Sequence, residues 1–302
     1  MAKSRTDFLG IALFPPSIYN VFAVVGMGAV GSLLAYFLNG AGVEPYAVSR
    51  TRCERYVFCD GGCRELRVRH VGRAPPEVRY SLVAVKGPDT ADALSAVSGV
   101  PVLFQNGIGG LELARRIFPS AAAAVVTYGV YREGCRAELR GRGEIILPRD
   151  AAEVGEALAR GGAAVRIVED VEPYRWAKLV VNAAINPVTA VLQAPNGVLL
   201  ENAWARALAE KLAGEAASVA AAVGYPVEGA FDAVLQVARA TAQNISSMAQ
   251  DLARCRPTEV DFINGAVVKY GGERGVPTPY NHAVYALVKA LEERCSSRSR
   301  TT

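Results

Sequence analysis

The feature that most constrains this chain is a glycine-rich turn between a short apolar strand and an apolar helix. The strand is expected over Val21–Val25, the turn reads Gly-Met-Gly-Ala-Val-Gly over residues 26–31, and the helix is expected over Ala29–Leu38. Such a turn lets the backbone approach a pyrophosphate, whose oxygens accept hydrogen bonds from the helix N-terminus. A turn without a ligand is the alternative. The context favours a dinucleotide site formed by Gly26, Met27, Gly28, Ala29, Val30 and Gly31.

The residues after the next expected strand, Glu44–Val48, indicate which dinucleotide is bound. An enzyme that uses NAD places Asp or Glu there, about twenty residues after the glycines, on the ribose hydroxyls. This sequence instead has Ser49-Arg50-Thr51-Arg52, and Arg50, helped by Arg52 or Ser49, is suited to a 2′-phosphate. We therefore expect NADP(H). The alternative is that both arginines are solvated loop residues.

Short apolar runs and helical stretches alternate up to about residue 170, which predicts a mainly parallel, doubly wound sheet. Further strands are expected over Ser81–Lys86, Val100–Gln105 and Ala164–Val168, and helices over Asp89–Val97, Leu111–Ile117 and Ala152–Arg160. Residues 122–148 are β-rich and interrupted by glycines, which suits antiparallel hairpins at the far side of the sheet.

The C-terminal part changes character, because helical periods replace strand-like alternation. Helices are expected over Ala203–Val223, Phe231–Ile245, Val260–Tyr270 and Tyr280–Glu293. At 302 residues, two domains are the default expectation. We therefore expect an extension over 1–20, an α/β domain over 21–170, an all-α domain over 171–295 and a polar tail over 296–302.

A narrow line of polar residues runs along the apolar segment 176–192. Lys178, Asn182 and Asn186 recur every four residues, so they share one ridge of a helix that is otherwise apolar. Buried ammonium and amide groups are costly without partners, so the ridge is either a structural network or the lining of a polar substrate site. We favour the substrate site. Pro187 is expected to bend the chain at Asn186.

Other polar residues stand at places where a site would form. Lys86 and Gln105-Asn106-Gly107 end two expected strands, where ligand sites of α/β sheets lie. A second polar cluster includes Asn244-Ile-Ser-Ser-Met248 and Thr258-Glu259, and Glu259 is the expected counter-ion of Lys178. Alternatively, Glu259 only occupies the first turn of a helix, where carboxylates are favoured. Neither histidine of the chain has a catalytic context.

The composition excludes several classes of protein. The 33 basic and 29 acidic residues are spread along the chain, which argues against a nucleic-acid surface. No apolar run approaches the roughly 20 residues of a membrane span, so we expect a cytoplasmic protein. The six cysteines lack C-x2-C spacing, so we expect no metal site and reduced, mostly buried thiols. A Cys59–Cys63 disulfide is left open.

Several motifs together resemble the ketopantoate reductase family. They are G-M-G-A-V-G at 26–31, Lys86, Q-N-G at 105–107, K-L-V-V-N-A-A-I-N-P-V-T-A at 178–190, P-N-G at 195–197, N-I-S-S-M-x-Q-D at 244–251 and T-E-V-D-F-I-N-G at 258–265. The resemblance covers about residues 21–290. It implies a Rossmann-type domain followed by a helical domain, an active site in the cleft between them, and NADPH-dependent reduction of 2-dehydropantoate.

The same resemblance assigns roles to individual residues. It implies that Lys178 is the general acid and that Glu259 contacts the substrate and this lysine. It places Lys86 and Asn106 by the nicotinamide and its ribose. It implies a substrate site formed by Asn182, Asn186, Asn196, Asn244 and Ser247.

Two other functions are kept as alternatives. One is a related two-domain NAD(P)-dependent dehydrogenase that acts on another 2-oxo acid or a 3-hydroxy acid. The other is a non-catalytic NADPH-binding sensor, which the presence of Lys178, Asn182 and Glu259 disfavours. The expected partner is a small branched 2-oxo acid, and whether the chain forms a homodimer is left open.

Overall fold

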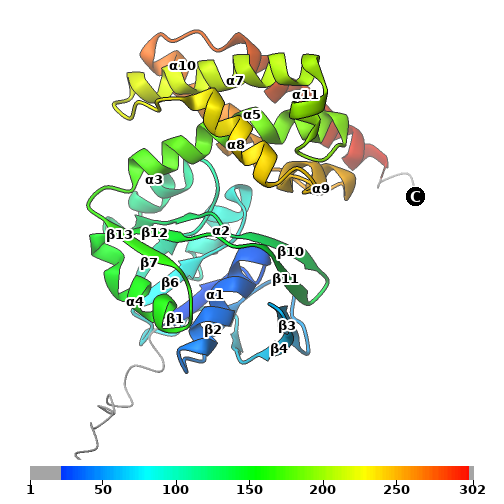
Figure 1. Cartoon of the computed structure of the whole chain (residues 1–302). Coiled ribbons are helices and arrows are strands. Elements are labelled where there is room, and N and C mark those ends of the chain that lie inside the picture. Colours follow the sequence, from blue (N-terminus) through cyan, green and yellow to red (C-terminus); the bar gives the residue numbers. More distant parts are fainter. Residues whose placement is uncertain (1–21, 299–302) are drawn as a thin grey trace, which may run out of the picture.

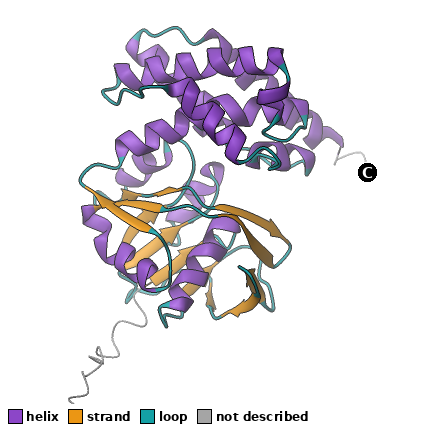
Figure 2. Ribbon diagram, viewed as in Figure 1, coloured by secondary structure: helices purple, strands orange, loops and turns teal. Residues whose placement is uncertain are grey.

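The computed structural model describes residues 22–298, with side chains up to residue 295. The extension expected over 1–20, Val21, and the end of the polar tail from residue 299 lie outside the described residues. Within the described part, every strand lies between residues 22 and 168, and only helices follow from residue 172. Figures 1 and 2 show these two parts as separate halves of the molecule, one mixed and one helical.

The main sheet is parallel throughout, as its strand pairs show. Its strands, in spatial order, are β5 (Arg69–Val71), β2 (Tyr46–Val48), β1 (Phe22–Val25), β6 (Tyr80–Val83), β7 (Val100–Leu103) and β8 (Ala122–Ala123). The order reverses direction at β1, which places the glycine-rich turn at the centre of the sheet, where dinucleotides bind in such folds.

Helices cover both faces of this sheet. Side chains of β1 alternate between two apolar cores, with Val24 in one and Val25 in the other, as the two-residue period of a strand requires. The first core is closed by α1 (Ala29–Gly40) and α4 (Ala152–Arg160), and the second by α2 (Thr90–Leu94) and α3 (Gly110–Arg115). The predicted Rossmann-type α/β fold is confirmed.

Two smaller sheets flank the main one. They contain β3 (Tyr56–Cys59), β4 (Cys63–Leu66), β9 (Val125–Val126), β10 (Gly129–Glu133), β11 (Arg136–Gly141), β12 (Ile145–Pro148) and β13 (Val165–Val168). The antiparallel β10–β11 hairpin matches the expectation, but β11 pairs in parallel with β3 in a sheet of its own. β3, β4 and β5 were not predicted, because these strands are short and β4 and β5 are largely polar.

The helical half is built around one central helix, α5 (Glu172–Leu192). Around it lie α6 (Val198–Glu201), α7 (Ala203–Ala222), α8 (Ala230–Ala240), α9 (Ser247–Ala253), α10 (Asn264–Arg274) and α11 (Pro279–Arg298). Alanines on α5 and α7, such as Ala183 and Ala213, are fully buried, and their small side chains let the two helices approach closely. Among the described helices, none is long and apolar enough to cross a membrane.

Two disulfides correct the expectation of reduced thiols. Cys53 pairs with Cys135, 82 residues away, and Cys59 pairs with Cys63. The first pair meets because the parallel pairing of β3 with β11 brings the two segments together, which residue spacing does not reveal. In the described part of the chain, no group of three or more His, Cys, Asp or Glu side chains is placed to hold a metal ion.

Candidate functional site

The glycine-rich turn forms a cradle suited to a pyrophosphate. Gly26 has φ +98°, a conformation that favours glycine, and a Cβ on Gly31 would lie 1.9 Å from the carbonyl oxygen of Gly26. A Cβ on Gly28 would have no neighbour closer than 3.9 Å, so space is left above the backbone. No side chain caps α1 and no acidic residue occupies its first turn. Its free N–H groups therefore suit an anion, as predicted.

The other residues of the turn contribute through their backbone. The Met27 side chain is buried in the sheet core, at 2% exposure, so it does not face a ligand. Ala29 and Val30 lie in the first turn of α1, where backbone N–H groups have no partner within the helix. The sequence-predicted residues therefore lie together at one place on the sheet.

Arg50 lies in the loop after β2, with its side chain 79% exposed. Its guanidinium forms an ion pair with Asp89, at 2.7 Å. Asp89 ends the short helical turn η2 (Gly87–Asp89) after β6, so Arg50 reaches across from one strand end to the next. This carboxylate was not predicted as a partner, because no sequence spacing relates a residue after β2 to one after β6.

Lys86 and Asn106 contact the helical half of the molecule. The Lys86 ammonium pairs with Asp251 of α9 at 2.5 Å. The Asn106 amide donates to Glu259 at 3.0 Å, and the backbone N–H of Gly87 donates to the other carboxylate oxygen at 3.3 Å. Burial raises the pKa of the Asp251 and Glu259 carboxyls, and the Lys86 charge opposes this for both. Asp251 is a second partner that sequence reasoning missed.

Lys178 lies on α5, and its ammonium donates to the carbonyl oxygen of Val126 at 2.5 Å. Burial lowers the pKa of this ammonium to about 8, and the negative charge of Glu259 acts in the opposite direction. No ion pair joins Lys178 to Glu259 within the described residues. The expected direct contact between the Lys178 ammonium and the Glu259 carboxylate is therefore replaced by a longer-range attraction. The carboxylate instead accepts hydrogen bonds from the Asn106 side chain and the Gly87 backbone.

Asn186 does not leave the helical conformation as expected, since α5 runs through Pro187 as far as Leu192. Pro187 has no N–H to give to the carbonyl oxygen of Ala183, four residues earlier. The buried Asn264 side chain donates to that oxygen instead, at 3.0 Å. The helix therefore continues past the proline, and the ridge of Lys178, Asn182 and Asn186 stays on one helix.

Of the expected substrate residues, Asn196 and Asn244 lie beside each other. The backbone N–H of Asn196 donates to the carbonyl of Asn244 at 2.9 Å, and its side-chain oxygen is buried without a partner. In the described residues, the side chains of Asn182, Asn186 and Ser247 form no hydrogen bond. Ser246, which the sequence analysis did not single out, caps α9 by accepting from Ala249.

Phe262, in the turn η4 (Val260–Phe262), holds the two halves together. A Cβ on Gly87 would lie 2.3 Å from its ring, and one on Gly107 would lie 2.2 Å from its carbonyl oxygen. The same oxygen accepts the N–H of Ile108 at 2.9 Å. We call this contact the Phe262 socket, formed by Phe262, Gly87 and Gly107. It fixes Glu259, three residues earlier, against the strand ends.

A surface cleft of about 320 Å³ lies elsewhere, between β8, the end of β12 and the start of α5. Its lining contains none of the predicted site residues, and its carboxylates, from Asp150, Glu169, Asp170 and Glu172, outnumber its one cation, Arg115. An anionic ligand is repelled by such a lining. The better candidate remains the place where Lys86 and Asn106, at two strand ends, lie close to Glu259 and Lys178 of the helical half.

Comparisons with known proteins agree with this geometry. The family model described as ketopantoate reductase PanE/ApbA matches residues 22–151, and that of its C-terminal part matches residues 170–292. A 2-dehydropantoate 2-reductase from Pyrobaculum aerophilum is 54% identical over 276 residues, which cover 91% of this chain and 99% of the relative.

Solved structures give the same result for the fold. A ketopantoate reductase family structure from Ralstonia eutropha superposes with a TM-score of 0.83 at 28% identity, covering 91% of this chain and 99% of that one. A structure of D-mandelate dehydrogenase with NADH and anilino(oxo)acetate also gives a TM-score of 0.83, at 22% identity and with the same coverage. The second likeness shows the fold alone.

Proposed function

The chain belongs to the ketopantoate reductase family, and we propose on this basis that its site reduces 2-dehydropantoate to pantoate with NADPH, a step in pantothenate and coenzyme A biosynthesis. The observation that carries the proposal is the position of Lys178. Its ammonium is buried enough to lower the pKa to about 8, and it shares a helix with the half-buried Asn182 and the buried Asn186. Such a group retains its proton at neutral pH and gives it up readily.

The chemistry needs a hydride and a proton. When bound, NADPH supplies the hydride that reduces the 2-oxo carbon of the substrate. Negative charge then develops on the carbonyl oxygen, and Lys178 stabilises this charge and donates the proton. Glu259 keeps the lysine charged, because its carboxylate raises the pKa that burial lowers. In this proposal Lys86 and Asn106, at the ends of β6 and β7, lie by the nicotinamide and its ribose.

The substrate is assigned to the helical half. We propose that Asn182, Asn186, Asn196, Asn244 and Ser247 hold the carboxylate and hydroxyl groups of a branched 2-oxo acid. The unpartnered side-chain oxygen of Asn196 supports a contact with the substrate's hydroxyl, because a buried acceptor without a donor is costly and a hydroxyl can donate to it. The domain limits follow the same division, with residues 21–170 binding the cofactor and residues 171–295 binding the substrate in the cleft between them. Cytoplasmic localisation and a homodimer belong to the same proposal.

One assay tests the reaction. Oxidation of NADPH is followed by absorbance with 2-dehydropantoate, 2-oxoisovalerate and pyruvate as separate substrates. We expect the highest kcat/KM with 2-dehydropantoate. A higher value with another 2-oxo acid would favour the related dehydrogenase, whose fold this chain shares. No turnover of any 2-oxo or 3-hydroxy acid, despite NADPH binding, would favour the sensor.

Arg50 is expected to select NADPH over NADH. Replacing it by alanine removes a charged hydrogen-bond donor from the 2′-phosphate, so the preference for NADPH should fall by about 1–3 kcal/mol. In this structure the Arg50 guanidinium is paired with the Asp89 carboxylate. The 2′-phosphate carries nearly two negative charges, so it should compete successfully with Asp89 for the guanidinium. The measurement is kcat/KM with each cofactor. Arg160→Ala, an exposed arginine on α4, serves as the control, and equal use of both cofactors by the unmodified protein contradicts the assignment.

A further inference from the structure

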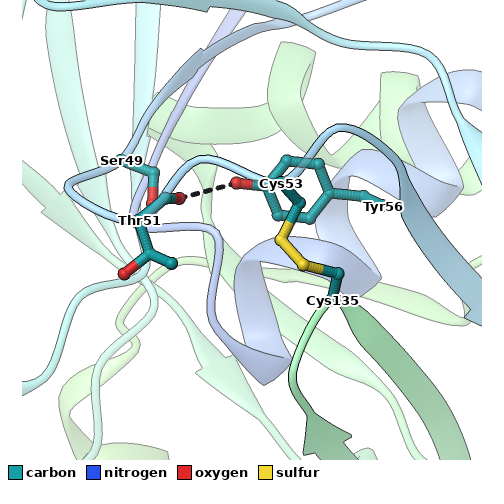
Figure 3. The surroundings of a disulfide bond; sticks show 5 residues. All are labelled: Ser49, Thr51, Cys53, Tyr56 and Cys135. Atoms are coloured by element: carbon teal, nitrogen blue, oxygen red, sulfur yellow. Dashed lines mark hydrogen bonds between the residues drawn. A yellow bond between two sulfur atoms is a disulfide. The ribbon is translucent and has the colours of Figure 1, made fainter.

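The loop that carries Arg50 has a covalent anchor at its far end. Cys53 is buried and forms a disulfide with Cys135, with 5.9 Å between the two Cα atoms. Cys135 lies in the turn between β10 and β11, so the bond joins the loop to this hairpin. Figure 3 shows the disulfide next to Ser49 and Thr51. The near end of the loop is fixed as well, because it leaves the main sheet at β2.

Hydrogen bonds close the same loop from within. The hydroxyl of Tyr56 donates to the carbonyl oxygen of Thr51 at 2.9 Å (Figure 3). The hydroxyl of Ser49 donates to the same oxygen, also at 2.9 Å. The Tyr56 ring is buried at 1% exposure, so its hydroxyl has little freedom to move. Arg50 therefore projects from a loop whose backbone is held on both sides.

The hairpin to which the loop is bound is itself well supported. It pairs with β3 through β11, and the N–H of Val57 donates to the carbonyl oxygen of Cys135 at 3.0 Å. On its other side, the guanidinium of Arg254 donates to the hydroxyl of Tyr131 at 2.8 Å. Arg254 belongs to the helical half, so the hairpin bridges the loop and that half.

The second disulfide has a different position. Cys59 and Cys63 face each other on β3 and β4, which are already paired as antiparallel neighbours. The two cysteines are four residues apart in sequence, and neither belongs to the loop that carries Arg50. Their bond closes a short turn and offers a matched comparison for the removal of a disulfide.

We propose that the Cys53–Cys135 disulfide positions the loop 49–53 to receive the 2′-phosphate, and so sets the affinity for NADPH relative to NADH. This inference rests on the proposed function, in which Arg50 binds that phosphate. A loop that is already ordered loses less conformational entropy when the ligand binds. NADH lacks the phosphate and gains nothing from the ordered Arg50, so only NADPH benefits from the tether.

The test compares two double variants with the unmodified protein. Replacing Cys53→Ser together with Cys135→Ser should raise KM for NADPH by roughly 2- to 10-fold, the cost of ordering one flexible side chain. KM for NADH and for the oxo acid should stay unchanged. Cys59→Ser together with Cys63→Ser should leave all three values unchanged. Circular dichroism and thermal unfolding identify a temperature at which every variant is folded.

Two further variants separate the possible outcomes. Tyr56→Phe keeps the disulfide and the ring but removes the bond to Thr51, so a smaller, equally selective rise is expected. In an Arg50→Ala background, removing Cys53–Cys135 should change nothing further for NADPH. An equal rise in KM for both cofactors, or no rise, overturns the proposal. A third outcome is a rise in KM for NADPH alone when the disulfide is removed, together with an Arg50→Ala variant that keeps the normal preference for NADPH. This outcome would support the positioning role of the disulfide and reject only the role of Arg50.

Discussion

Replacing Lys178 by alanine should lower kcat for the reduction by about 10²- to 10⁴-fold, the usual contribution of a general acid. NADPH binding should persist, because the glycine-rich turn lies on β1 and α1 and the lysine on α5. The loss is also expected for Lys178→Arg, since a guanidinium carries charge but does not give up its proton in this pH range. Comparable activity in the arginine variant would show that charge alone suffices.

The control is Lys269→Ala, which removes an exposed lysine from α10. Its ammonium lies 4.0 Å from Glu273, at a distance where an exposed ion pair contributes little. Steady-state kinetics and NADPH fluorescence are measured on all variants. A Lys178→Ala protein that binds NADPH and keeps most of its kcat would exclude the lysine as the proton donor.

The pH dependence of the same reaction follows from the pKa of Lys178. Only the protonated ammonium donates, so kcat/KM for the reduction should fall as the pH rises through about 8. Glu259→Gln removes the negative charge that raises this pKa, so the fall should begin at lower pH. The glutamine keeps the shape of the side chain, and its effect should be milder than that of Glu259→Ala.

Replacing Gly31 by alanine should destabilise the protein by about 3 kcal/mol, the upper end of the usual cost of overpacking, since a clash with backbone is hard to relieve. The added Cβ would lie 1.9 Å from the carbonyl oxygen of Gly26, which is part of the turn itself. Either the turn opens or α1 moves off β1, and NADPH binding is lost in both cases. The free energy of unfolding, from denaturant titration, measures the effect.

Gly214→Ala is the matched control for this change. Gly214 lies within α7, and a Cβ there would have nothing within 4 Å. Alanine is the better helix former, so this variant should be stabilised by roughly 0.5–1 kcal/mol. An unchanged unfolding free energy for Gly31→Ala would mean that the turn has more freedom than its geometry indicates.

The parts of the fold that sequence patterns predicted are those fixed by local rules. The helix over Ala152–Arg160 was predicted to the residue, because its apolar period and the surrounding turns are local. The ridge of Lys178, Asn182 and Asn186 was recognised for the same reason. Residues 56–71 gave no such signal, since strands such as Arg69–Val71 gain their order from a neighbouring strand rather than from their own pattern.

What sequence could not predict are the contacts between distant segments. Asp89 and Asp251 pair with Arg50 and Lys86 across different strand ends, and no spacing relates these residues. Asn264 belongs to a motif that was recognised in the sequence. Its hydrogen bond to the carbonyl oxygen of Ala183 could not be predicted, because it depends on the packing of α10 against α5. The same holds for the disulfide between segments 82 residues apart.

The Phe262 socket means that the two halves of this protein are not interchangeable modules. A chimera that joins residues 22–170 to the helical half of a relative would keep the junction only if that relative presents a side chain at this place that fits against Gly87 and Gly107. Conversely, a larger residue at Gly87 requires a compensating change at Phe262, because its Cβ would lie 2.3 Å from the ring. Position 107 has to stay glycine, because a Cβ there would lie 2.2 Å from the backbone carbonyl oxygen of Phe262, which is present whatever the side chain. Recombination between homologues should therefore succeed only when positions 87 and 262 are exchanged together and position 107 is glycine in both.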